Sequence, residues 1–404
     1  MAKKILVYTN HFDPEHFKIN EVVNWLLNSG AHVHVITGLP NYPEGKIYSG
    51  YGIFKKSYEK KQKLTVRRLP LITRGRASKF RLSINYLSYF ISTIFYTIYL
   101  ILSKQKFDKV LVHHTSPFFI VVSASIYIKM TKTKGLLWEL DLWPETLKAV
   151  GIISSKMVFK LIEKIVKKTY KYYETILVGS YNFKSIILER SRHSNVKYFP
   201  NWAEEILEIN KTDPSFNFNF DFDVKKLKIM YTGNIGFAQG FDKLCEIIKE
   251  NKINNLQWIF IGEGRFKSRM KELLSVQIAN KEVVFIPKQK LEILPSWIAK
   301  ADFMYLSLNN SELFKNTVPA KLQGYMAMGK PILASISGEG KKIISSANCG
   351  FISQPENKKI FISMLKKALK TNHQDRIKLG ENGKNYYFQN FSIKLRKKQL
   401  INLI

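Results

Sequence analysis

The residues from Val318 to Ser335 combine a helix start, a lysine and a buried strand in an order that suits phosphate binding. Pro319 fits the first helical turn, where its missing N–H costs nothing, and Asn316 or Thr317 is a candidate cap. The free N–H groups and partial positive charge of such a helix start attract an anion, and Lys321 adds a full charge. An ordinary αβ unit with a solvated lysine has the same spacing, so the pattern alone leaves both interpretations open.

Two glycine-containing turns lie in the same half of the chain. Gly233 and Gly236 follow one predicted strand, and residues 261–267 follow another and include Arg265. Glycines let the backbone turn tightly and approach a phosphate. Neither turn ends in Gly-Lys-Ser/Thr, so neither is a Walker loop. With Lys321, the turns predict a diphosphate site at one end of one sheet; three unrelated surface turns are the alternative.

Carboxylates and histidines follow predicted strands in the first half. Glu15 and His16 come after the first strand, and His114 and Asp141 come after later ones. Such groups at strand ends suit hydroxyl recognition and acid–base work on a polyol. His113 and His114 are a candidate metal pair, but neighbouring residues on a strand point to opposite faces, so we expect no metal site.

The elements that must position these residues alternate between strand-like and helix-like patterns, which is typical of doubly wound parallel sheets. The strands expected in the first half are 5–9, 32–37, 65–69, 109–113, 135–139 and 175–179. Those expected in the second half are 227–231, 257–261, 283–286, 303–306, 332–334 and 350–352. We therefore predict an α/β protein in which the carboxyl ends of two sheets face one ligand-binding cleft.

Changes in composition predict the domain boundaries. Residues 1–200 form a first domain, and 201–224, where the alternation breaks, form a linker. Residues 225–385 form a second domain, and the helical region 386–404 is long enough to cross back to the first. At 404 residues, 45% of them hydrophobic, the chain can bury two cores.

The net charge of +33, from 64 Lys and Arg against 31 Asp and Glu, favours a polyanionic neighbour. The basic residues lack interleaved aromatic platforms on a recognised module, so we expect no nucleic acid. Only two cysteines, Cys245 and Cys349, and no signal-peptide pattern predict a cytoplasmic protein in a reducing compartment.

One basic segment is followed by an uncharged one. Its cations are Lys55, Lys56, Lys60, Lys61, Lys63, Arg67, Arg68, Arg74, Arg76, Lys79 and Arg81. The uncharged stretch Leu82–Ser103 is long enough to cross a bilayer, but its polar residues favour a helix in the membrane interface or the domain core. A second basic stretch, 155–173, spaces Met157, Leu161 and Ile165 at helical intervals. We expect peripheral attachment to an anionic membrane surface, on the inner face of the cell membrane; a solvated helix face is the alternative for 155–173.

Several motifs in consistent order resemble WbuB-like family 4 glycosyltransferases. They are Pro14–Asn20, Thr37–Lys46 with Gly50-Tyr51, Asp141–Glu145, Pro200–Trp202, Gly233–Gly240 and Val318–Lys321. The resemblance implies a GT-B fold with two Rossmann-like domains, binding the acceptor in 1–200 and a nucleotide-sugar donor in 225–385. It also implies retaining transfer, without a metal or cofactor, of N-acetyl-L-fucosamine or another N-acetylated amino sugar from a UDP-sugar. The acceptor would be a lipid-linked (polyprenyl diphosphate) saccharide in surface polysaccharide, O-antigen or capsule biosynthesis.

The sequence departs from the family's motifs in the donor domain. Many members carry two glutamates separated by seven residues, where this chain has Asn316 and Gly324, so Gln323 is the remaining candidate for the ribose. Asn234 and Gln239 stand where the family commonly has Arg and Lys. Because of these departures, we expect Arg265 and Lys321 to supply the positive charge that binds the diphosphate. The predicted donor-binding residues are Gly233, Asn234, Gly236, Gln239, Arg265, Lys321 and Gln323.

The resemblance makes Asp141 and Glu15 the acidic candidates near acceptor and sugar, with His16 and His114 as secondary candidates. Three alternatives stay open at this point. A sugar-nucleotide epimerase of similar architecture would need no acceptor, and a nucleic-acid-binding protein would bind oligonucleotides in a salt-sensitive way. A catalytically dead relative would fit the missing glutamate pair.

Overall fold

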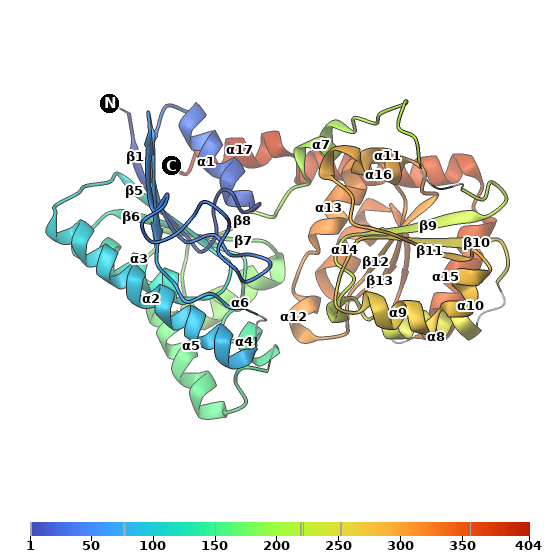
Figure 1. The fold of residues 1–404 in the computed structure, drawn as a ribbon, viewed down its shortest axis with the longest axis horizontal. Helices are drawn as coiled ribbons and strands as arrows, with labels where there is room; N and C mark the ends of the chain where they lie inside the picture. The colour runs from blue at the N-terminus through green and yellow to red at the C-terminus, as the bar shows by residue number, and fades with distance from the viewer. Residues whose placement is uncertain are drawn as a thin grey trace. The chain divides into compact units, whose positions relative to one another are not determined.

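A computed structural model describes residues 2–75, 78–149, 151–218, 220, 222–250, 253–355 and 357–404. Arg76 of the basic segment lies outside the described residues. The chain divides into two compact units (Figure 1): Met1–Phe199 with Lys397–Ile404, and Pro200–Arg396. The second unit thus includes the segment 201–224, and the last eight residues pack with the first unit.

The first unit contains an eight-stranded sheet in the order β3-β4-β2-β1-β5-β6-β7-β8. Its strands are β1 (Lys4–Thr9), β2 (His32–Gly38), β3 (Tyr58–Lys61), β4 (Leu64–Leu69), β5 (Lys109–His114), β6 (Lys134–Glu139), β7 (Thr175–Val178) and β8 (Val196–Tyr198). All neighbouring strands are parallel except β3 and β4. In the middle of the sheet, Val7 of β1 pairs with Val35 of β2 and with Leu111 of β5. These three side chains are fully buried, because a parallel sheet has both faces covered.

Helices cover this sheet. They are α1 (Lys18–Asn28), α2 (Lys79–Leu102), α3 (Phe119–Thr131), α4 (Glu145–Ala149), α5 (Lys156–Tyr170), α6 (Tyr181–Ser191) and part of α17 (Ile393–Ile401). α1 buries Ile19, Val22, Val23 and Leu26, whose spacing of three and four residues forms one apolar face. α2 lies beside α3 (Figure 1), and α3 packs on β1, β5 and β6. At the chain end, Gln399 Nε2 donates to Tyr198 O over 2.8 Å, which attaches α17 to the strand β8.

The second unit contains a six-stranded parallel sheet in the order β11-β10-β9-β12-β13-β14. Its strands are β9 (Leu227–Thr232), β10 (Leu256–Ile261), β11 (Val283–Ile286), β12 (Phe303–Ser307), β13 (Ile332–Ser335) and β14 (Gly350–Ser353). Its helices are α7 (Glu205–Ile209), η1 (Phe237–Gln239), α8 (Phe241–Glu250), α9 (Lys267–Leu273), α10 (Ser275–Ala279), η2 (Leu291–Ile293), α11 (Leu294–Ala299), α12 (Glu312–Lys315), α13 (Ala320–Ala327), α14 (Gly338–Ala347), α15 (Lys358–Lys370) and α16 (His373–Asn390). Within this unit, Tyr387 OH donates to Glu208 Oε2 over 2.6 Å and so connects α16 to α7.

The predicted parallel strands are confirmed in both units, each within two residues of its expected bounds. Two strands of the first sheet were missed. β3 lies at the sheet edge, runs antiparallel and carries the charged sequence Glu59-Lys60-Lys61, so it lacks the apolar signal of a buried strand. β8 has only three residues.

The helix start predicted near Pro319 is confirmed, but its capping residues are wrong. α13 begins at Ala320, with Pro319 at the N-cap position and no side-chain cap. Asn316 instead ends the preceding helix α12, and Thr317 Oγ1 donates back to Leu313 O over 2.8 Å. Gly329 follows α13 in the left-handed conformation at φ +64°, which suits a helix stop before β13.

Burial of His113 in the first sheet predicts a pH-dependent stability. The side chain is 1% exposed, its Nδ1 lies 2.9 Å from Thr9 Oγ1, and burial lowers the pKa of His113 to about 3. Between pH 6.5 and 3 only the unfolded chain binds this proton, so stability falls as the pH drops below 6.5, by about 1.4 kcal/mol per pH unit.

Between pH 7.5 and pH 5.0, we expect the unfolding free energy of the wild-type protein to fall by about 2 kcal/mol more than that of His113→Asn. Urea unfolding at both pH values measures this difference. The exposed His32 provides the control, because His32→Asn should keep the wild-type pH dependence. An equal pH dependence in His113→Asn and wild type would contradict the assignment.

Candidate active site

The strands β9 and β10 end in two turns that pack backbone against backbone. Gly233 N donates to Ile261 O over 2.9 Å. A Cβ atom on Gly262 would lie 1.9 Å from Gly233 O, and one on Gly264 would lie 2.2 Å from Ile235 O. Gly262 and Gly264 also adopt φ values of +148° and +158°, which only glycine tolerates easily. The close approach therefore fixes the shape of this edge of the second sheet.

Lys321, from the first turn of α13, lies across Gly233. A Cβ atom on Gly233 would be 2.6 Å from Lys321 Cε, so the absence of a side chain there leaves room for the lysine. Lys321 Nζ lies 5.2 Å from the centroid of the Tyr231 ring, within the range of a cation–π contact. Burial lowers the pKa of Lys321.

In the described part of the chain, no carboxylate pairs with the Lys321 ammonium and no hydrogen bond to it is found. A largely desolvated cation without a partner is unfavourable, and an anion bound beside Gly233 would relieve that cost. The structure thus brings together two of the predicted donor-binding residues, Gly233 and Lys321, and gives them a chemistry suited to phosphate.

Gly236 and Gln239 hold the first turn together. Gly236 N donates to Gln239 Oε1 over 3.0 Å, and both residues are buried. The Gly236 N–H, which we expected to face a phosphate, is therefore already satisfied inside the turn. Asn234, in contrast, is exposed beside Gly233.

The second turn presents one cation and neutralises another. Arg265 is exposed, and no described carboxylate pairs with it. Lys267 Nζ lies 2.6 Å from Glu263 Oε1 and also donates to Gly262 O over 2.9 Å. Lys267 therefore stabilises its own turn, and Arg265 and Lys321 are the cations that this edge of the sheet can offer to a ligand.

Gln323 and Gly324 face the protein interior. Gln323 is fully buried, and its amide nitrogen can donate to Pro319 O and Ala320 O over 2.9 and 3.0 Å. Gln323 therefore presents no exposed hydrogen-bond donor for the predicted contact with the ribose. A Cβ atom on Gly324 would lie 3.1 Å from Leu207 Cδ1, so α13 packs closely on α7 at this position.

In the first unit, Glu15 acts as a clamp. Its Oε1 accepts the N–H groups of Asn41 and Tyr42 over 2.7 and 2.6 Å, and its Oε2 lies 2.8 Å from His11 Nδ1. Glu15 is 2% exposed, so neither oxygen is available to a substrate in this structure. His16 is exposed and makes no hydrogen bond within the described residues.

His114 is fully buried at the end of β5. Its Nδ1 contacts Glu139 Oε1, and Tyr170 OH donates to Glu139 Oε2 over 3.2 Å. Burial raises the pKa of Glu139. The predicted contact of His114 with an acceptor is therefore not possible in this structure, because the ring lies inside the core of the first unit.

Asp141 is half-buried at the end of β6, where both of its carboxylate oxygens accept hydrogen bonds. The donors are the hydroxyl groups of Ser116 and Thr146. Ser116 Oγ in turn accepts Trp143 Nε1–H over 2.8 Å. Of the four predicted catalytic residues, Asp141 is the one whose carboxylate is both partly exposed and held in place by neighbours.

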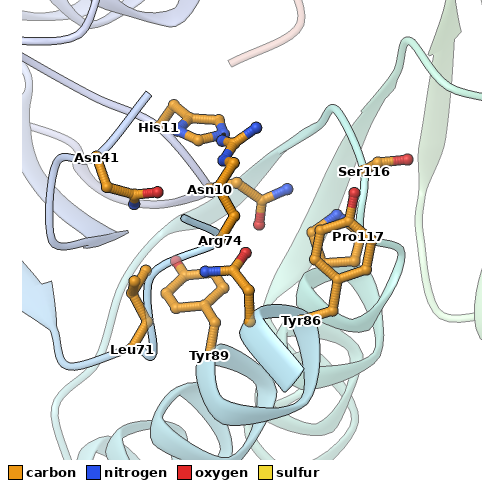
Figure 2. A pocket seen from close by; sticks show the side chains of 10 residues that line it. Asn10, His11, Asn41, Leu71, Arg74, Tyr86, Tyr89, Ser116 and Pro117 are labelled. Carbon is orange, nitrogen blue, oxygen red and sulfur yellow. The ribbon is translucent and has the colours of Figure 1, made fainter. Parts of the chain in front are cut away.

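The sequence analysis missed a pair of residues beside Glu15. His11 Nε2 lies 3.5 Å from a terminal nitrogen of Arg74, and the Arg74 guanidinium stands 4.8 Å from the centroid of the Tyr42 ring. Figure 2 shows the two side chains next to each other in a pocket at the end of β1. The spacing of His11 and Glu15, four residues apart in one loop, is the only local signal for this arrangement. Among the described residues no group of three His, Cys, Asp or Glu side chains could hold a metal ion.

Comparison with known proteins supports a transferase. Residues 213–386 match the family described as glycosyl transferases group 1. WcaI of Escherichia coli, named as a colanic acid biosynthesis glycosyl transferase, is 24% identical over 81% of this chain and 81% of its own length. WbjE of Pseudomonas aeruginosa, named as a glycosyltransferase, is 22% identical over 63% of this chain and 64% of its own. The chain is a glycosyltransferase.

Solved structures establish the fold class of this glycosyltransferase. Sucrose-phosphate synthase from Thermosynechococcus elongatus has a TM-score of 0.69 and 14% identity, and the match covers 100% of this chain and 98% of that one. HepE of Anabaena, solved in complex with UDP, has a TM-score of 0.69 and 12% identity, with 99% of each chain covered. The predicted GT-B fold is confirmed, and the group 1 match includes the edge that carries Gly233 and Lys321.

The close packing of the two turns predicts a large effect of a methyl group at position 262. Gly262→Ala should lower the unfolding free energy by about 2 kcal/mol or more, because the Cβ atom would collide with Gly233 O and the backbone would be strained. Gly30 has φ +92° but no atom within 4 Å of a Cβ, so Gly30→Ala should cost only the strain, about 1 kcal/mol. Urea unfolding of both variants checks the difference, and equal losses would contradict the packing argument.

Proposed function

We propose that this glycosyltransferase moves a sugar, with retention, from a UDP-sugar to a lipid-linked acceptor. The observation that carries the donor part is the largely buried Lys321 ammonium beside Gly233, which pairs with no carboxylate in the described ranges. A nucleotide diphosphate provides the negative charge that this lysine lacks, and Arg265 adds a second cation on the neighbouring turn. The UDP present in the HepE complex supports uridine as the nucleotide.

Charge neutralisation at the leaving group is the main catalytic contribution that we propose for the second unit. When the bond between the sugar and the diphosphate breaks, negative charge grows on the diphosphate oxygens. Lys321 and the start of α13 would stabilise that charge without reorganising, since both are fixed by packing. No metal ion or cofactor takes part in the proposed reaction.

The proposed pathway is surface polysaccharide biosynthesis, in O-antigen or capsule assembly. The name of WcaI, which places that protein in colanic acid biosynthesis, supports this choice. The resemblance of the motifs to those of WbuB-like enzymes favours N-acetyl-L-fucosamine or another N-acetylated amino sugar as the transferred group, and a polyprenyl diphosphate saccharide as the acceptor. Product analysis without an acceptor separates this proposal from an epimerase, which would still convert its substrate.

Lys321→Ala tests the donor site. We expect its Kd for UDP in calorimetry to rise about 10- to 100-fold, because one charge-assisted contact to a phosphate is lost. Lys243→Ala is the control, since Lys243 is exposed in the same unit and pairs with Glu246. Its Kd should remain within twofold of wild type.

Unchanged UDP affinity in Lys321→Ala would rule out the proposed phosphate contact. A screen of UDP-sugars for turnover onto a lipid-diphosphate saccharide then identifies the donor sugar. Turnover with no UDP-sugar, together with absent UDP binding, would contradict the proposed function as a whole.

We further propose that the first unit works on the inner face of the cell membrane. α5 exposes Met157, Leu161 and Ile165 to 79%, 59% and 44%, at intervals of one helical turn. The same helix carries exposed lysines, namely Lys156, Lys160, Lys164, Lys167 and Lys168. An apolar stripe bordered by lysines suits a helix that lies in the interface of an anionic bilayer.

α2 supports the same location. Its residues 80–102 are long and apolar enough to cross a membrane by length and composition, and they are the only such helix in the described ranges. The core helix of a soluble protein can pass the same test, but here only 28% of the apolar window is buried. Exposed side chains recur every three or four residues on α2, at Leu87, Ile91, Phe95, Ile98 and Leu102. This pattern favours contact with the interface over a complete span.

The basic segment before α2 contributes less to this surface than its charge suggests. Arg68 is 2% exposed, forms an ion pair with Glu59 and donates to Asp13 O over 2.9 Å. Arg67 stacks 5.7 Å from the centroid of the Tyr96 ring. These arginines stabilise the first unit, so the lysines of α5 are the better candidates for lipid headgroups.

Leu161→Glu tests the membrane surface. We expect binding to vesicles containing phosphatidylglycerol to fall at least fivefold in co-sedimentation, because a buried apolar contact is replaced by a charge that the lipids repel. Val276→Glu, on the 64% exposed Val276 of α10 in the second unit, is the matched control and should bind as wild type. Equal losses in both variants, or no binding by wild type, would contradict the proposed surface.

A further inference from the structure

A pocket opens at the carboxyl edge of the first sheet, and none of the four predicted catalytic residues lines it. Its cavity volume is about 50 Å³, and the pocket is partly open to solvent. The lining residues are Asn10, His11, Asn41, Leu71, Arg74, Asn85, Tyr86, Tyr89, Ser116 and Pro117. They come from the segments after β1, β2, β4 and β5 and from α2. Figure 2 shows His11, Asn41 and Arg74 on one side of the pocket and Ser116 and Pro117 on the other.

Arg74 gives this pocket a positive charge without a matching acid. None of the lining residues is Asp or Glu, and no carboxylate of the described residues forms an ion pair with Arg74. The Arg74 Nε–H is buried and has no hydrogen-bond partner among the described residues. Two acids that contact lining residues are held by other groups: Glu15 by His11 and the loop N–H groups, and Asp141 by the hydroxyl groups of Ser116 and Thr146.

The pocket also contains acceptors that lack donors. Asn10 and Asn41 are 6% and 2% exposed, and the Oδ1 atom of each is buried with no partner in the described part of the chain. Asn41 Nδ2 donates to Leu39 O over 2.8 Å, which fixes the orientation of its amide. Two unsatisfied amide oxygens beside a guanidinium that pairs with no described carboxylate suit a ligand that carries hydroxyl groups next to an anionic group.

Neighbouring contacts hold the guanidinium in position. The Tyr42 ring lies beneath Arg74, and the Glu15 clamp fixes both the Tyr42 backbone and the His11 ring. Because a carboxylate only accepts hydrogen bonds, the proton on His11 Nδ1 faces Glu15, which leaves Nε2 towards Arg74. The cation is thus placed before any ligand arrives, which lowers the entropic cost of binding.

We propose that this pocket binds a phosphorylated sugar, with Arg74 donating to a phosphate oxygen and Asn10 and Asn41 accepting hydrogen bonds from sugar hydroxyl groups. This assignment rests on the proposed transfer, in which the ligand is the sugar diphosphate portion of the lipid-linked acceptor. A soluble sugar phosphate has the same chemistry, and the test below separates the two sources. Arg74 is a binding residue here, and no proton transfer is assigned to it.

The test is calorimetry on the full chain with UDP at saturation, so that the donor site is already filled. The probes are N-acetylglucosamine on a short-chain lipid diphosphate, N-acetylglucosamine 1-phosphate, and an uncharged alkyl glycoside of the same sugar. Arg74→Gln should weaken binding of the lipid diphosphate about tenfold or more, and Arg74→Lys should weaken it less, because it keeps the charge but loses the planar donors. Arg192→Gln removes an exposed guanidinium of the same unit and should change the Kd by less than twofold.

Each outcome decides the assignment. Binding of the uncharged glycoside should be weak and should not change in Arg74→Gln; equal losses for charged and uncharged probes would overturn the phosphate contact. Tighter binding of the lipid diphosphate than of N-acetylglucosamine 1-phosphate supports the lipid-linked acceptor as the ligand. Equal affinities for the two probes support a soluble sugar phosphate.

Two further outcomes separate this inference from the proposed function. No binding of either charged probe to a wild-type protein that binds UDP would overturn the pocket assignment alone. Absence of UDP binding would instead contradict the donor site and with it the proposed transfer. Unchanged UDP affinity and circular dichroism in Arg74→Gln show that a loss of probe binding is not a loss of folding.

Discussion

The donor edge of the second unit depends on the backbone contact between the turns after β9 and β10. Gly262 and Gly264 let these turns approach until their main chains touch, and Gly233 leaves the space that Lys321 crosses. A side chain at any of these glycines would move the lysine or separate the turns. The position of the positive charge therefore follows from three places where no side chain fits.

In the first unit, a side chain holds the loops at the strand ends in place. Glu15 joins two loops by accepting two backbone N–H groups and contacting His11, and the pocket with Arg74 forms beside it. Both units thus have rigid strand ends, with backbone contacts in one and a buried carboxylate in the other. In each, a cation has no acidic partner among the residues that the structure describes, which is the state expected of a protein whose partner is an anionic ligand.

Most of the fold could be predicted because a parallel αβ protein repeats one pattern: buried apolar strands such as Ile5–Thr9 and Leu227–Tyr231 separated by helices. The failures lie where that signal is weak, as in the charged edge strand β3. Site residues were harder to predict. Glu15, His114 and Gln323 have the right chemistry for a site, but the structure uses them for a clamp, a buried pair and a helix start.

The sequence by itself determined the two αβ units, the class of enzyme suggested by its motifs, and the presence of Lys321 at a helix start between glycine-rich turns. Local patterns suffice for these features because helix starts, turns and strands depend on residues near in sequence. Only the tertiary structure decided which polar groups stay unpaired. Whether Arg74 pairs with a carboxylate, and whether Gln239 accepts the Gly236 N–H, depends on how the loops fold. Side-chain type alone does not specify those contacts.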